Sequence, residues 1–509
     1  MGKKFTYKTI VWTTCYLSLG ILFITLLAPV VRISVVLLSI PLFFALIFYF
    51  YYGQPLLQKI WTWITDEKVI RRIAVYAACL YLAFSSYMLL VLPVTQLSEF
   101  GVHFVSLAWL EGKPLYHSFN SEDQYSLLYG PLTYLIYAAA YSMVGVNFYA
   151  PKVISVVFFS LTIFSIWKLT RNASPSKYRL IIWLIIFSYV GMWATLPFAP
   201  KADTLLIAFI GLAMVVIDTK IHFIIKSVLL GILIGLSIHL KVTAILYFIP
   251  VVLFLIVKSD RFEQVFSLIL VTASAVAFSS LIFITPGLSI EHYMAWVLLS
   301  IKHGFSSTIV MQNLLIISPV VFLGFFAKSE RPEKLGWLAL LIATFLVIFP
   351  ASKNGAGCYH FAPFLPVLAY LLAKSTFPVE RINAMKWGIM SMFALFWLFF
   401  VVPVSFAINA GVYTYQLKDL YEMKDRISQF KNKHPHETFA VVGWPIWDPI
   451  VYLNGGKLQF SYWSLLDAAV SGKKLSNRSI ESLSKCKIKF WFAKTGERSE
   501  EHTSELQSR

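Results

Sequence analysis

Long apolar runs alternate with short polar segments along most of the chain. Runs of about 20 apolar residues are long enough to cross a membrane as helices. Runs at 10–30 and 33–53, joined at Arg32, predict a first helix pair, and 73–94 predicts a third helix. Further membrane helices are expected near 149–167, 180–197, 203–218, 227–240, 242–257, 263–285, 309–327, 335–351, 361–373 and 387–408. The pattern therefore predicts an all-α polytopic membrane protein with roughly thirteen crossings.

The predicted topology depends on the apolar segment 131–146. This segment is short for a crossing of about 30 Å, so it can be interpreted in two ways. As a crossing it would place Arg171, Lys177 and Arg179 outside and invert every later loop. As a juxtamembrane helix on the outer surface, it places all the basic loops in the cytoplasm, as the excess of Lys and Arg in cytoplasmic loops requires. These loops are 168–179, 220–226, 258–261, 328–334 and 374–386. We adopt the second interpretation.

The same rule places the N-terminus, with three lysines before residue 9, in the cytoplasm of a plasma (inner) membrane protein, and the C-terminus outside. No cleavage site stands out after the first apolar run, so an uncleaved anchor is expected. The net charge of +18 could indicate a nucleic-acid partner, but the basic residues lie between apolar runs, so topology explains it better. Hydrophobic residues make up 58% of the chain and charged residues only 13%, which excludes a soluble protein of this size.

The composition changes after about residue 410. Segment 415–432 is charged and helical in pattern, and 438–444 and 487–493 have the pattern of short buried strands. We expect a small extracytoplasmic α/β domain over 411–497, incomplete at its end. The predicted organisation is an N-terminal hairpin and cytoplasmic loop (1–72), a membrane domain (73–410) with its first outer loop at 95–148, and this small domain. Residues 498–509 resemble a translated DNA-sequencing adapter and are excluded. Cys358 and Cys486 could pair if both lie outside.

Acidic and basic residues gather in the outer loops that this topology predicts. Glu99 opens the first long outer loop, where lipid gives way to water, and a short amphipathic segment follows it. Charged groups near the hydrocarbon are costly, and they are usually paired or functional. The candidate substrate-binding residues in later outer loops are Lys201, Asp203, Lys241, Lys353, Tyr359 and His360. A carboxylate can act as general base on a hydroxyl, and lysines can stabilise a departing phosphate. The set therefore fits a transferase acting on a lipid-phosphate substrate.

Each candidate also has a structural interpretation. Glu99 could mark the interface, and Asp203 could be the N-cap of the helix that begins there. Lys201 and Lys241 could extend along the membrane surface towards water, and Tyr359 and His360 could be interface aromatics. The candidates in the 286–308 loop are weaker, because amphipathic outer helices commonly carry such residues; they are Glu291, His292, Lys302 and His303.

Several short motifs resemble those of the C-type-fold membrane glycosyltransferases, close to the protein-mannosyltransferase and aminoarabinose-transferase-like group. Glu99, Gly101, Ala108, Gly112 and Tyr116 match the start of that family's first outer loop. The later matches are Tyr129–Leu132, Lys201–Asp203, Gly235–Thr243 with Lys241 in place, and Gly355–Pro366. The matched region is about 71–410.

This resemblance implies inverting transfer from a polyprenyl-phosphate sugar, with Glu99 as general base. It leaves the acceptor open among lipid A, another glycolipid, a polysaccharide and a protein. Ser98 stands where many members carry a second acid, and Lys201 where Arg is common, so use of a divalent metal, with Glu99 and Asp203 as possible ligands, stays open. A lipid-linked oligosaccharide flippase and a glycan polymerase or ligase are the alternative functions.

Overall fold

The structure is a computed structural model that describes residues 99–147, 149–173, 199–327, 329–375, 421–442 and 454–493, with positions 182, 183, 186 and 452. The predicted helix pair at 10–53, the helices at 73–94 and 387–408, most of the one at 180–197, and the tail at 498–509 lie outside the described residues.

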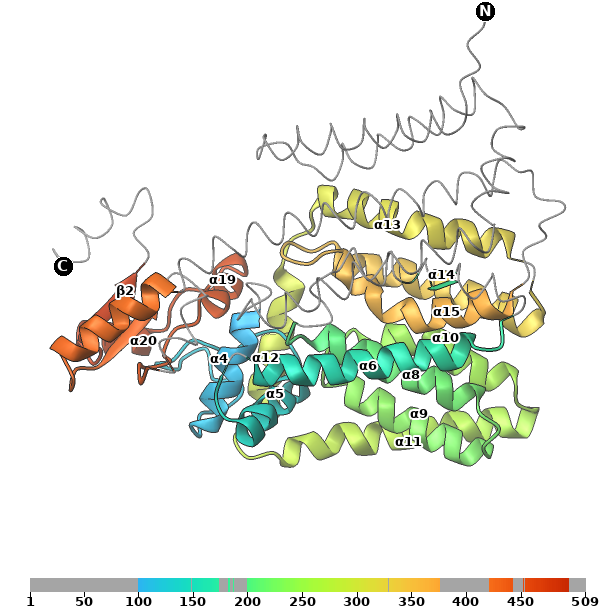
Figure 1. Cartoon of the computed structure of the whole chain (residues 1–509), viewed down its shortest axis with the longest axis horizontal. Helices are drawn as coiled ribbons and strands as arrows, with labels where there is room; N and C mark the ends of the chain where they lie inside the picture. Colours follow the sequence, from blue (N-terminus) through green and yellow to red (C-terminus); the bar gives the residue numbers. More distant parts are fainter. Residues whose placement is uncertain are drawn as a thin grey trace, which may run out of the picture.

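Long helices lie side by side and form the body of the molecule (Figure 1). They are α6 (Ala150–Thr170), α8 (Ala202–Asp218), α9 (Phe223–Ile238), α10 (Ala244–Val257), α11 (Arg261–Leu281), α13 (Ser307–Phe326), α14 (Arg331–Ala351) and α15 (Leu365–Lys374). Each begins and ends within a few residues of its predicted range. Within the described residues, three helices are long and apolar enough to cross a membrane: α6, Arg261–Ile284 and α14. The protein is therefore a mostly helical membrane protein.

Two glycines allow α9 and α11 to approach closely. A Cβ added at Gly231 would lie 2.5 Å from the carbonyl oxygen of Val271, and one at Gly235 would lie 2.6 Å from that of Ala275. Small residues at helix contacts are common in membrane proteins, where packing rather than water exclusion holds helices together. Any larger side chain at these positions would force the two helices apart.

Short helices cover one end of this body (Figure 1). They are α4 (Glu99–Leu110), α5 (Pro131–Val144), α12 (Ile290–Leu299) and the 3₁₀ helices η1 (Ile282–Ile284), η2 (Ser300–Lys302) and η3 (Cys358–Phe364). The start of α5 is held at the α9–α10 turn, where the Gly130 amide donates to the Leu240 carbonyl at 3.0 Å and the Leu132 amide to the His239 carbonyl at 2.9 Å. Helix α5 is thus fixed at the end of the bundle, among the other short helices (Figure 1). This supports its interpretation as a juxtamembrane helix.

The opposite end of the bundle is basic. Lys258 donates to the hydroxyl of Tyr370 at 2.8 Å, and both Lys258 and Lys374 lie about 4 Å from the carboxylate of Asp218. Lys226 donates to the Ile217 carbonyl at 3.2 Å at this same end. The 17 residues of α8 separate this end from Lys201 and Asp203, which is roughly 25 Å at the usual rise of a helix. The described basic residues Lys226, Lys258 and Lys374 thus lie away from Lys201 and Asp203, as the predicted topology requires.

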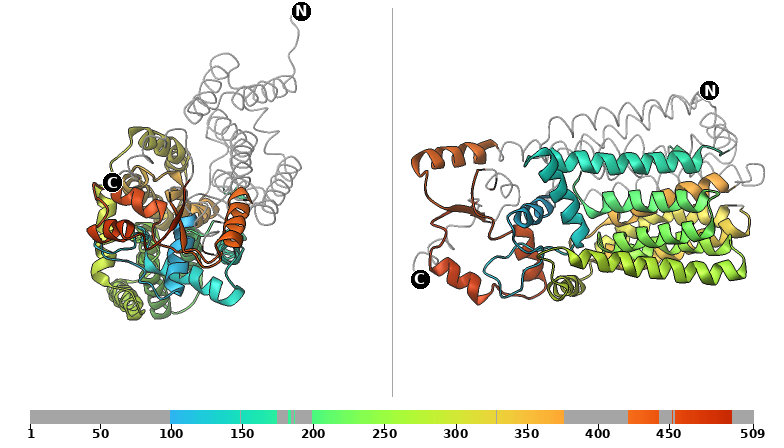
Figure 2. Two further views of the ribbon diagram at one scale, coloured as in Figure 1. Left: turned by 90° about the vertical axis from the view of Figure 1, so that its left-hand side faces the viewer. Right: turned by 90° about the horizontal axis from the view of Figure 1, so that it is seen from below.

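The C-terminal region lies beyond the short helices (Figures 1 and 2). Residues 421–433 form a helix, followed by β1 (Phe439–Val442), α19 (Tyr462–Val470), α20 (Asn477–Ser484) and β2 (Phe490–Ala493). Strands β1 and β2 pair in parallel, with Phe439 opposite Phe490, and lie inside the two predicted strand segments. A separate α/β domain with these boundaries stays a prediction. Cys358 and Cys486 are both free.

The C-terminal region is attached to segment 113–124, which belongs to the predicted first outer loop. The backbone of Gln124 exchanges two hydrogen bonds with the segment 459–461, each of 2.8 Å. Lys113 donates to the Leu458 carbonyl at 2.7 Å and pairs with Asp123 at 2.9 Å, while Glu122 pairs with Lys487 at 2.7 Å. These charged residues of the first loop therefore hold the C-terminal region in place.

Candidate functional site

Residues from three distant parts of the chain meet at the end of the bundle away from the basic loops. Lys201 and Asp203 lie at the start of α8, Lys241 in the turn between α9 and α10, and Tyr359 and His360 in η3. The ammonium of Lys241 donates to Oδ1 of Asp203 at 2.8 Å and lies 3.5 Å from Nδ1 of His360. We call these five residues the Lys241 cluster. The structure thus brings together five of the seven predicted site residues.

Asp203 is completely buried in this cluster. Helix α8 begins at Ala202 and its N-cap residue is Lys201, so the N-cap interpretation of Asp203 is wrong. Oδ1 accepts from Lys241, whereas Oδ2 has no hydrogen-bond partner among the described residues. Because burying a polar atom without a partner costs free energy, Oδ2 is suited to accept a hydrogen bond from a bound ligand.

The two lysines point inward. The side chain of Lys241 is only 12% exposed, and its Nζ lies 5.2 Å from the ring centre of Tyr359 and 6.0 Å from that of Tyr129. Lys201 is also buried, with its Nζ 5.1 Å from the ring centre of Tyr359. Tyr359 therefore contacts both ammonium groups at cation–π distance. Lysines that extended along the surface to reach water would not make these contacts, so that interpretation does not fit.

The other polar groups of the cluster are neutral. Burial, together with the charge of Lys241, lowers the pKa of His360 to about 3, so its imidazole is uncharged at neutral pH. Burial raises the pKa values of Tyr129 and Tyr359 well above their ordinary value, so both phenols keep their protons. The cluster thus combines two cations, one carboxylate and neutral donors and acceptors, which suits an anionic ligand that also carries hydroxyl groups.

This charge balance bears on the open question of a metal. Two ammonium groups adjoin Asp203, and they would repel a divalent cation. Over the described ranges, no three His, Cys, Asp or Glu side chains come together in a way that could hold a metal ion. The described part of the site fits a phosphate better than a metal.

The remaining two of the seven predicted site residues are Glu99 and Lys353. Glu99 is the first residue of α4, and its role as general base stays a prediction. Lys353 is outside the Lys241 cluster: its ammonium donates to the Ser300 carbonyl at 2.7 Å, and its backbone pairs with Phe305. This arrangement holds the two outer loops together, and nothing in it points to substrate binding.

Two further polar residues, Asp467 and His303, lie near the cluster and can be recognised only once the fold is known. Asp467 of α19 is mostly buried, with Oδ1 3.8 Å from Nε2 of His303, which follows η2. In the sequence, His303 is one of the weaker candidates of the 286–308 loop, and Asp467 is not a candidate. No sequence signal could select Asp467, because it lies in the C-terminal region and reaches this end of the bundle only through tertiary packing.

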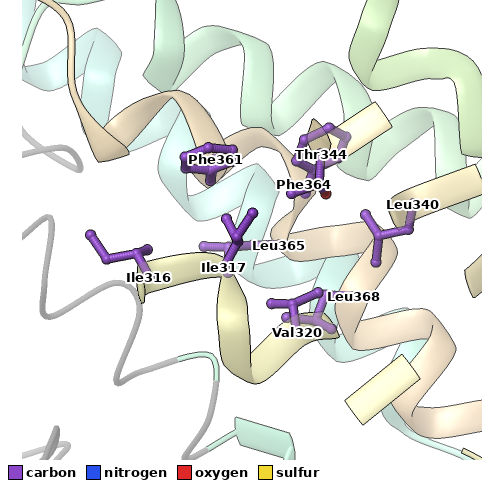
Figure 3. Close-up of a pocket in the computed structure, with 9 residues that line it drawn as sticks. All are labelled: Ile316, Ile317, Val320, Leu340, Thr344, Phe361, Phe364, Leu365 and Leu368. Atoms are coloured by element: carbon purple, nitrogen blue, oxygen red, sulfur yellow. The ribbon is translucent and has the colours of Figure 1, made fainter. Parts of the chain in front are cut away.

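An apolar cavity adjoins η3 on its other side (Figure 3). It has a volume of about 20 Å³ and lies between η3, α13, α14 and α15. Phe361 and Phe364 of η3 line it together with Ile317, Leu340 and Leu365. The same short helix therefore carries His360 in the polar cluster and apolar side chains in a small hydrophobic space.

Comparison with solved structures identifies the architecture. The structure resembles that of ArnT from Cupriavidus metallidurans bound to undecaprenyl phosphate, with a TM-score of 0.53 and 12% sequence identity over 81% of this chain and 90% of that one. The chain has the fold of ArnT. The apo state of ArnT gives a TM-score of 0.52 at 10% identity, with the same coverage.

The likeness to ArnT is one of fold. No protein-family profile and no curated protein matches the sequence. The resemblance to C-type-fold membrane glycosyltransferases that the motifs predicted is thus confirmed for the architecture. At these identities, the activity must be argued from the site itself.

Proposed function

We propose that this protein is an integral-membrane glycosyltransferase of the plasma membrane that moves a sugar from a polyprenyl-phosphate donor to an acceptor on the extracytoplasmic face. The observation that carries the proposal is the Lys241 cluster, which places two ammonium groups at the end of the bundle away from the basic loops. The bound undecaprenyl phosphate in the structure of ArnT, which shares this fold, supports the choice of donor.

The two lysines would bind the donor phosphate. Lys241 uses one N–H on Asp203 and has further donors for a phosphate oxygen, and the ammonium of Lys201 lies 5.1 Å from the centre of the Tyr359 ring. Charge builds up on the phosphate as the bond to the sugar breaks, and fixed cations in a water-poor site stabilise it strongly. Because Asp203 holds Lys241 in place, it positions this cation.

Glu99 is proposed as the general base. The acceptor hydroxyl attacks C1 of the sugar, the bond from C1 to the phosphate oxygen breaks, and the polyprenyl phosphate leaves with the electron pair. Glu99 takes the hydroxyl proton, so the sugar is transferred with inversion. A phosphate leaving group needs no protonation, unlike the leaving group in hydrolytic glycosidases, which use a pair of carboxyl groups. One carboxylate with nearby lysines is therefore sufficient.

A transfer assay tests this function. Purified protein in nanodiscs is given radiolabelled undecaprenyl-phosphate sugars and a membrane glycan extract, and the label in new glycosidic linkages is measured. Wild-type protein should form labelled product and release undecaprenyl phosphate, and Lys241→Met should not. Lys374→Met, at the opposite end of the bundle, is the matched control and should transfer normally. Movement of labelled lipid across the bilayer without a new glycosidic bond would contradict the proposal and favour a flippase.

A further inference from the structure

One face of α19 is directed at the end of the bundle that holds the proposed transfer site. Trp463, Asp467 and Ser471 are spaced four residues apart and so follow one face of this helix. A Cβ added at Gly101 of α4 would lie 3.4 Å from the Trp463 ring, and Ser471 donates to the Leu299 carbonyl of α12 at 3.3 Å. Asp467 lies between these two contacts. It is therefore held against α4 and α12 by packing on both sides.

The side chains of Asp467 and His303 lie next to each other and are mostly buried, but they form no hydrogen bond with each other. Their side chains are 19% and 10% exposed, and Oδ1 of Asp467 lies 3.8 Å from Nε2 of His303, which is too long for a hydrogen bond. Within the described part of the chain, Nε2 of His303 is buried without a hydrogen-bond partner, and the partly exposed Asp467 carboxylate accepts no side-chain hydrogen bond. Buried polar groups are normally satisfied, so the unpaired Nε2 of His303 needs an explanation.

The carboxylates of Asp467 and Asp203 both interact with the same two tyrosines. The hydroxyl groups of Tyr129 and Tyr359 both interact electrostatically with Asp203 and with Asp467. The Asp203 side carries the ammonium groups of Lys201 and Lys241, whereas burial without a neighbouring cation raises the pKa of Asp467 to about 7. The two carboxylates near these tyrosines thus differ in surroundings, because Asp203 adjoins two ammonium groups whereas the pKa of Asp467 is set by burial alone.

We propose that Asp467 and His303 form the acceptor side of the transfer site, where they hydrogen-bond a hydroxyl group of a glycan acceptor. A hydroxyl group can donate to the carboxylate of Asp467 and bond to Nε2 of His303, which would satisfy both groups. Helix α19 thus makes the C-terminal region part of the site. The inference rests on the proposed transferase function, and it assigns the donor phosphate to the Lys241 cluster and the acceptor hydroxyl group to Asp467 and His303.

The test separates acceptor binding from donor binding. Full-length protein in nanodiscs is given radiolabelled undecaprenyl-phosphate sugar with a membrane glycan extract, and label in glycan product is compared with free sugar released by hydrolysis. Asp467→Asn and His303→Gln should each lower the ratio of transfer to hydrolysis by about tenfold or more, the usual size for one lost charge-assisted hydrogen bond. Their Kd for undecaprenyl phosphate should stay within about twofold of the wild-type value, and the double variant should lose little more than either single variant.

Glu481→Gln is the matched control. It removes an exposed carboxylate of the same C-terminal region, in α20, which pairs only with Lys485 in its own helix turn, and it should leave the ratio unchanged. An unchanged ratio in Asp467→Asn would overturn the inference, as would weakened binding of undecaprenyl phosphate. If the wild-type protein neither binds undecaprenyl phosphate nor transfers sugar, the proposed function fails first and the inference fails with it.

Discussion

Lys241 and Asp203 form an ion pair of 2.8 Å between the α9–α10 turn and the first turn of α8, with the carboxylate completely buried. A buried pair of this kind contributes little net stability, because the desolvation of both charges offsets their attraction. Removing one partner is different, since it leaves an uncompensated charge. The pair therefore links the local stability of the site to its ability to bind phosphate.

Lys241→Met should lower the free energy of unfolding by about 3–5 kcal/mol, because Asp203 would be left charged and unpaired. The double variant Lys241→Met, Asp203→Asn should recover most of that stability and still fail to bind undecaprenyl phosphate. Denaturation followed by tryptophan fluorescence measures the first effect, and a lipid-binding assay measures the second. Recovery of binding in the double variant would show that Lys241 acts only through folding.

Glu99→Gln should reduce sugar transfer by about a hundredfold or more, as expected for the loss of a general base, without changing membrane insertion. Glu111→Gln, just beyond the other end of α4, is the matched control and should retain full transfer. The initial rate of transfer at saturating donor measures the effect. Normal rates in Glu99→Gln would remove the assignment of the base.

Lys353→Met should reduce transfer by less than about fivefold, because its ammonium binds the Ser300 carbonyl away from the Lys241 cluster. The loss of this hydrogen bond should instead lower stability by roughly 1–2 kcal/mol. Transfer rates and melting curves, measured in parallel with Lys241→Met, distinguish the two roles. A loss of donor binding equal to that of Lys241→Met would restore Lys353 to the substrate site.

The ranges of the described bundle helices could be predicted closely from the sequence. Long apolar runs form membrane helices, and the basic segments mark the loops between them. The sequence also predicted Lys201, Asp203, Lys241, Tyr359 and His360 as one site, because the topology put their loops at one surface. It could not distinguish Asp203 as an N-cap from Asp203 as a partner of Lys241, since that depends on where α8 begins to within one residue.

Lys353 and Asp467 show where such reasoning ends. Both residues lie in predicted outer segments. The pattern of polar and apolar positions does not show which polar side chain is directed at the site and which one stabilises a loop. Lys353 is turned to the Ser300 carbonyl by its backbone pairing with Phe305. Asp467 reaches the site because Trp463 and Ser471 fix α19 against α4 and α12. Lys353 and Ser300 are 53 positions apart, and the contacts of α19 join residues still farther apart in the sequence, so no local pattern records them.

The pH dependence of stability gives a further test of Asp467. Its pKa is about 7 in the folded protein and 3.8 ordinarily, so between about pH 4 and pH 7 the folded state binds more protons than the unfolded state. Stability should therefore fall as the pH rises through this window, with a cost above pH 7 of up to about 4 kcal/mol for this group. Asp467→Asn cannot ionise at this position, so it should be more stable than wild type at pH 8.

The groups that face Asp467 define the controls for this measurement. Tyr129, Tyr134 and Tyr359 stay protonated over the whole range, and the imidazole of His303 is the neighbour that lies 3.8 Å from the Asp467 carboxylate. Melting temperatures at pH 5 and pH 8 should therefore be compared for Asp467→Asn in both the wild-type and His303→Gln backgrounds. If Asp467 served only to stabilise the fold, its substitution would lower the stability of the protein. A gain of stability at pH 8 together with a loss of transfer is what a carboxylate retained for substrate binding predicts.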